Sequence, residues 1–111
     1  DAMLLPEPQA TKARLEQHVK LFDSRDKNLQ LGVVAFRKKI LSEPRRKDQV
    51  AKFIKAYNIA VDSINSRGVQ HYASIITKYT GADAKTISNL PKLKYEHAME
   101  PRRRDLAVAQ K

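Results

Sequence analysis

Residues 50–64 read VAKFIKAYNIAVDSI, and this stretch carries the strongest periodic signal in the chain. Its larger apolar side chains recur at the spacing of an α-helix, which places them on one stripe. The stripe comprises Val50, Phe53, Ile54, Tyr57, Val61 and Ile64. We therefore predict a helix here whose apolar face packs in a core. It starts either at Pro44, behind Ser42 or Glu43, or at Asp48, and ends at Asn65–Gly68.

Further helices are predicted on both sides of this stretch. Tyr72, Ile75, Ile76 and Tyr79 repeat the same spacing, and Gly81 then provides a C-terminal stop. Asp83 is a candidate N-cap for a short helix over residues 84–90, which Pro91 ends. A weaker pattern favours a helix over residues 9–21, and Pro101 favours a last one toward the C-terminal end.

Two segments instead have the composition of strands. Residues 1–5 are mostly apolar and stop at Pro6, which cannot donate to a sheet ladder. Residues 29–36, LQLGVVAF, contain Val33, Val34 and Phe36, which favour extended structure. The expected fold class is thus α/β, predominantly helical with two strands.

The composition restricts the function classes. The chain has 111 residues and no cysteine. Its formal net charge is +10, and such an excess of positive charge is typical of proteins that bind nucleic acid or an anionic surface. The basic clusters Arg37–Lys39, Arg45–Lys47 and Arg102–Arg104 each have an acidic residue nearby, so we expect solvated faces there.

No pattern indicates catalysis or a metal. His18, His71 and His97 are not spaced as ligands of one ion, and no nucleophile elbow or phosphate-binding glycine loop is present. We predict no enzyme activity and no cofactor. The tyrosines on helix stripes, Tyr57, Tyr72 and Tyr79, are expected in the core with their hydroxyls at its rim.

The segment Pro6-Glu7-Pro8 is the candidate binding site. It joins a predicted strand to a predicted helix, where α/β folds place ligands. Glu7 could accept hydrogen bonds from a ligand, or it could stabilise the positive end of the helix dipole. Both interpretations stay open on the residues alone.

The opening DAMLLPEPQATKA resembles a segment found late in extracytoplasmic solute-binding proteins of ABC importers, in the branch for sulfonates, nitrate or the pyrimidine precursor of thiamine. LQLGVVAFRKKIL is similar to the strand that crosses between their lobes. Phe53, Ala56, Tyr57 and Ala60 match a Phe-x-x-Ala-Tyr-x-x-Ala pattern that is common there. The resemblance covers nearly the whole chain in order, although no single motif is specific.

The resemblance implies a two-lobed fold of the periplasmic-binding-protein type II kind, of which this chain is a C-terminal fragment. Residues 1–36 would be a remnant of the second lobe with a hinge strand, and residues 37–111 the helical part of the first lobe. Pro6, Glu7 and Pro8 would face a small polar or anionic solute in the interlobe cleft, and Val34 and Phe36 would be hinge residues. The implied partner is an ABC permease, and the implied location is periplasmic or extracellular and membrane-anchored.

Three other hypotheses stay open. Strands that lack their neighbours could pair between copies, giving a homo-oligomer. The net charge also permits a small basic helical module that binds nucleic acid. Finally, the stripe from Val50 to Ile64 could be a face for a partner protein.

Overall fold

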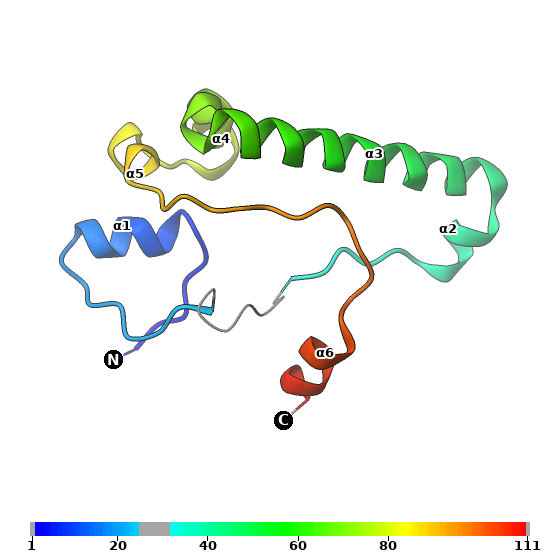
Figure 1. Ribbon diagram of the computed structural model, residues 1–111, viewed down its shortest axis with the longest axis horizontal. Coiled ribbons are helices and arrows are strands. Elements are labelled where there is room, and N and C mark those ends of the chain that lie inside the picture. The colour runs from blue at the N-terminus through cyan, green and yellow to red at the C-terminus, as the bar shows by residue number, and fades with distance from the viewer. Residues whose placement is uncertain (1, 25–31, 111) are drawn as a thin grey trace. The chain divides into compact units, whose positions relative to one another are not determined.

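The computed structural model describes residues 2–24 and 32–110, and its main regular elements are helices (Figure 1). They are α1 (Gln9–Leu15), α2 (Lys38–Ser42), α3 (Pro44–Arg67), the 3₁₀ helix η2 (Val69–Tyr72), α4 (Ala73–Thr80), α5 (Ala84–Ser88) and α6 (Arg103–Ala109).

The prediction of an α/β fold with two strands is wrong, because no described residue lies in a strand. Ala2–Pro6 and residues 32–36 lack regular structure, and residues 29–31 lie outside the described ranges. Met3, Leu4, Val33 and Val34 are all largely exposed. Apolar, β-branched composition makes a segment suitable for a strand, but a strand also needs a neighbouring strand to complete its ladder, and the described residues of these segments do not form one.

Helix α3 confirms the strongest periodic signal and starts at Pro44, the earlier of the two predicted positions. The expectation that its stripe is core is largely wrong. Val61 is 4% exposed, whereas Phe53 is 49% and Ile54 is 38% exposed. The repeat every three to four residues determines which side chains share a face, but burial requires a second element against that face.

Contacts divide the described chain into two units. Unit 1 takes its residues from Asp1–Leu21 and Ala60–Tyr95, and unit 2 from Phe22–Ile59 and Glu96–Lys111. The predicted division into residues 1–36 and 37–111 follows from the resemblance and stays a prediction.

The core of unit 1 forms around α5. This helix contacts α1, η2 and α4. Its Thr86 and Ile87 are almost fully buried, together with Thr11 of α1, Val61 of α3 and Ala82. Burial of Ile87 alone is worth roughly 1.5–3 kcal/mol. The short helix is therefore held mainly by packing, since five residues are too few for a stable isolated helix.

Two predicted helix ends around this core are confirmed. Gly81 adopts a left-handed conformation with φ of 70°, and its N–H donates to the carbonyl of Thr77 at 2.9 Å, which ends α4. The Asp83 carboxylate accepts a hydrogen bond from the backbone N–H of Thr86 at 2.7 Å and caps α5. This turn fixes the direction in which α5 leaves α4.

Candidate functional site

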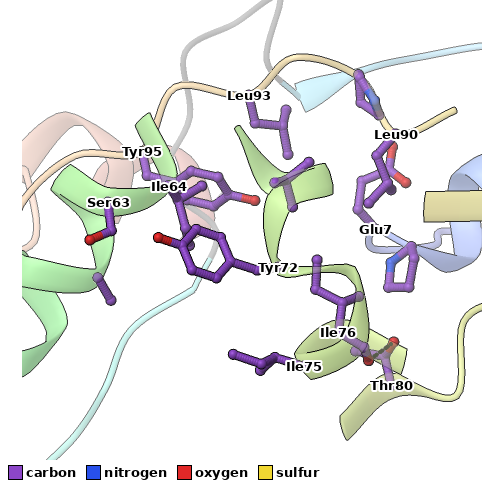
Figure 2. A pocket seen from close by; sticks show the side chains of 14 residues that line it. Glu7, Ser63, Ile64, Tyr72, Ile75, Ile76, Thr80, Leu90, Leu93 and Tyr95 are labelled. Atoms are coloured by element: carbon purple, nitrogen blue, oxygen red, sulfur yellow. Dashed lines mark hydrogen bonds between the residues drawn. The ribbon is translucent and has the colours of Figure 1, made fainter. Parts of the chain in front are cut away.

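Unit 1 contains an apolar cavity with a volume of about 490 Å³. Small-molecule sites commonly fall between roughly 300 and 1,000 Å³. Side chains from α3, η2, α4, the loop before α1 and the segment after α5 surround it (Figure 2). They are Glu7, Pro8, Ala60, Ser63, Ile64, Val69, Tyr72, Ile75, Ile76, Thr80, Leu90, Pro91, Leu93 and Tyr95.

Two of the three predicted ligand-binding residues, Glu7 and Pro8, line this cavity. In Figure 2 Glu7 lies on the same side as Leu90, and Ser63 and Tyr95 lie on the other side of the view. Pro6 is absent from the lining. Its carbonyl accepts a hydrogen bond from the N–H of Ala10 at 2.9 Å and so belongs to the entry into α1.

Glu7 has a structural role as well as a position on the cavity wall. Its Oε2 accepts a hydrogen bond from the backbone N–H of Thr11 at 3.1 Å, which satisfies an amide in the first turn of α1. The peptide bond from Glu7 to Pro8 is cis. Among the described residues, the other carboxylate oxygen, Oε1, does not share this hydrogen bond, and Glu7 lines the cavity.

The segment after α5 forms one wall of the cavity and is tied to α3 by Asn65. The side chain of Asn65 donates to the carbonyl of Tyr95 at 2.8 Å and accepts from its N–H at 3.0 Å. This two-bond contact resembles one rung of a strand ladder. It brings Tyr95 beside Tyr72, and Figure 2 shows both rings at the end of the cavity where Ser63 and Ile64 lie.

The polar groups of the cavity are few. Thr80 is already engaged: its hydroxyl donates to the carbonyl of Ile76 at 2.7 Å and accepts from the N–H of Ala82 at 3.2 Å. Ser63 and the two tyrosines provide further hydroxyls. None of the lining residues is lysine, arginine or histidine, so the lining contains a carboxylate and no cationic side chain.

The predicted hinge residues, Val34 and Phe36, do not line this cavity. Val34 is 65% exposed. Phe36 packs edge to face against Phe53 of α3, with ring centroids 5.9 Å apart, inside unit 2. Their role as a hinge therefore stays a prediction that follows from the resemblance.

The basic clusters have two different environments. At the start of α6, Arg102, which precedes the helix, and Arg104 both contact the buried carboxylate of Asp105, with Arg102 Nε 2.6 Å from Oδ2. Around α2, by contrast, Arg37, Lys39 and Arg46 border a second cavity of about 270 Å³ with Ile40 and Glu43. Arg46 lies 3.7 Å from Glu43, and both side chains are largely exposed.

Neither a metal centre nor a membrane-spanning element is found in the described part of the chain. Over these residues there is no cluster of three or more histidine, cysteine or acidic side chains that could hold an ion. Likewise, none of the described helices is both long enough and apolar enough to cross a bilayer.

Sequence reasoning did not find most of the cavity lining. Tyr72, Ile75 and Ile76 were predicted on an apolar stripe, but that stripe could equally have been filled core. Asn65 is the residue that could have indicated the position of Tyr95, because its side chain hydrogen-bonds to the Tyr95 backbone. From the sequence, Asn65 is interpreted only as part of a helix end. In comparisons with known proteins, no family model, curated protein or solved structure matches the chain.

Proposed function

We propose that this chain is part of the substrate-binding component of an ABC importer and binds a small solute in the cavity of unit 1. One observation carries the proposal. Glu7 and Pro8, which the resemblance to solute-binding proteins marks as facing a ligand, lie in the wall of an apolar cavity of about 490 Å³. The permease partner and the periplasmic or extracellular location follow from the same resemblance.

The lining favours one class of solute within this function. A sulfonate or nitrate ion would enter an apolar space that contains a carboxylate and no cationic side chain. An anion in that position would remain unpaired after desolvation, which is unfavourable. A neutral or cationic molecule with a flat apolar ring fits better, because its ring can pack against Tyr72 and Tyr95 and its donor can reach Glu7.

Probes that share one ring and differ in charge test this assignment. We expect benzylamine and an aminopyrimidine to bind the chain with 1:1 stoichiometry in native mass spectrometry. Benzyl alcohol should bind more weakly, and benzenesulfonate should not bind. If benzenesulfonate binds best, the cavity does not select by charge as proposed.

Two substitutions locate the binding. Ile76→Trp places a bulky indole ring in the cavity and should abolish binding, whereas Ser74→Trp on the same helix lies outside the lining and should leave it unchanged. Glu7→Gln keeps an oxygen for Thr11 but removes the charge, so affinity for benzylamine should fall about tenfold, and the exposed Glu16→Gln is its control. Binding that survives Ile76→Trp in a chain with unchanged circular dichroism would contradict the proposal.

A further inference from the structure

Unit 2 carries an exposed surface in which cationic and apolar side chains alternate, here called the basic–apolar face. Between Arg37 and Lys55 the chain has eight basic and two acidic residues, which accounts for six of its ten excess positive charges. All eight basic residues are exposed. They belong to α2, the residue before it and the first half of α3, where Lys52 and Lys55 lie on the side of the helix opposite Phe53 and Ile54.

The apolar side chains on this face are exposed as well. Leu41, Phe53, Ile54 and Tyr57 are each between 38% and 49% exposed. Phe53 is the residue whose ring packs against Phe36. Arg46 precedes Phe53 by seven positions, and Lys47 precedes Ile54 by seven. Because seven residues are close to two helical turns, each cation lies on the same side of α3 as an exposed apolar residue.

Few of these cations are neutralised. The ion pairs recorded for this segment among described residues join Arg46 to Glu43 and Lys52 to Asp48. Both pairs are solvent-exposed and span one turn, and with both acids counted against the eight basic residues the segment keeps a net charge of +6. A partner for this surface must therefore supply negative charge and also accept apolar side chains.

We propose that the basic–apolar face docks onto an anionic lipid surface. An amphipathic basic helix that lies in the interface buries its apolar side chains at the acyl boundary and places its cations among the headgroups. Phe36 and Phe53 can enter the boundary together, because they are already in contact. This binding is separate from the solute cavity, all of whose lining residues belong to unit 1.

Charge and chemistry favour this occupant over two others. A second copy of the chain would bring the same positive face against itself, which electrostatic repulsion opposes. Nucleic acid would neutralise the cations, but the aliphatic Leu41 and Ile54 can neither hydrogen-bond nor stack on bases, so their exposed surface would gain little. A lipid surface satisfies both kinds of side chain.

Vesicle flotation with the full chain tests the proposal. We expect binding to phosphatidylcholine vesicles that contain phosphatidylglycerol and little binding to pure phosphatidylcholine. The affinity should be lower at about 0.15 M salt than at about 0.01 M, because screening weakens the electrostatic part. Replacing Arg46→Gln and Lys47→Gln together should weaken binding about fivefold for each cation removed.

Matched variants on the opposite side of α3 act as controls. On the basic–apolar face, Phe53→Ser with Ile54→Ser should abolish the binding that persists at the higher salt. Its control is Ile59→Ser, which changes an exposed apolar residue on the other side and should not abolish that binding. Lys52→Gln with Lys55→Gln should weaken binding less than the Arg46 and Lys47 pair. Circular dichroism at 222 nm verifies that each variant retains its helices.

Three results would overturn the proposal. The first is a lack of selectivity. The chain would then bind neutral and anionic vesicles equally, or the control variants on the opposite side of α3 would weaken binding as much as the variants on the basic–apolar face. The second is binding to a DNA duplex that is tighter than binding to vesicles and is unaffected by Phe53→Ser with Ile54→Ser, which identifies a nucleic-acid surface. The third is a dimer in light scattering that the same double variant dissociates, which identifies a second copy as the occupant.

Discussion

At the scale of single residues, Asp83 and Glu7 show how one carboxylate can organise a turn. Each accepts a hydrogen bond from a backbone N–H in the first turn of a helix. For Asp83 this role was predicted from its place before residues 84–90. For Glu7 the sequence left a structural and a ligand-binding role open, and the geometry is compatible with both, since one oxygen caps α1 while the residue lines the cavity.

The cap at Asp83 predicts a specific pH dependence of stability. Hydrogen bonds from the Thr86 backbone and side chain hold the pKa of Asp83 below its usual value of 3.8, with smaller contributions from Lys12 and Lys85. A carboxyl with a depressed folded-state pKa stabilises the fold above its unfolded pKa and loses that contribution as the pH falls through the folded pKa. Stability from this cap should therefore be complete above about pH 4 and decline at more acidic pH.

Thermal unfolding of Asp83→Asn and Asp83→Ala checks this prediction. Asparagine is also a good N-cap but does not titrate, so Asp83→Asn should lose part of the decline below pH 4. Asp83→Ala removes the cap and should lower the melting temperature by a few degrees at neutral pH. Identical acid profiles for the wild type and Asp83→Asn would contradict the assignment.

At the scale of elements, α3 connects the site and the basic–apolar face, because its later turns line the cavity and its earlier turns carry the cations. The sequence predicted this helix and its stripe, but it also predicted that the whole stripe is core. Val61 confirms that expectation, and Phe53, Ile54 and Tyr57 do not. Tyr79, on the next predicted stripe, is 76% exposed for the same reason: no described element covers it.

The Asn65 contact predicts a measurable change in the segment after α5. Asn65→Ala removes both hydrogen bonds to Tyr95 and should cost about 1–2 kcal/mol locally. The amide of Tyr95 should then exchange with deuterium faster. Ser66→Ala is a matched control, because Ser66 Oγ donates to the carbonyl of Ser63 within α3. An unchanged exchange rate at Tyr95 in Asn65→Ala would show that other contacts hold this wall of the cavity.

At the scale of the whole molecule, the described residues bury little apolar surface. Val61, Ala82 and Ile87 are the buried apolar residues among them, and all three belong to unit 1. Because the cooperativity of unfolding reflects the surface that becomes exposed, we expect a shallow urea transition with a slope near the low end of the usual range, about 1 kcal/mol/M.

Two probes should also report different transitions, because the buried core lies in one unit. Circular dichroism at 222 nm follows every helix, and α3 dominates it by length. Three of the four tyrosines, Tyr72, Tyr79 and Tyr95, belong to unit 1, so tyrosine fluorescence follows that unit more directly. We expect midpoints that do not coincide. A single steep transition seen by both probes would show that the chain unfolds as one cooperative body.

The sequence by itself determined the features that depend on neighbours along the chain. These are the periodic helix through residues 50–64, the stop at Gly81 and the cap at Asp83, since side-chain spacing and backbone preference act locally. It could not determine whether residues 2–5 and 32–36 pair as strands, or which side of α3 is covered. Those outcomes depend on a second segment being present at the right distance. Only the tertiary structure decided that these apolar residues stay exposed and that Glu7, Tyr72 and Tyr95 surround one cavity.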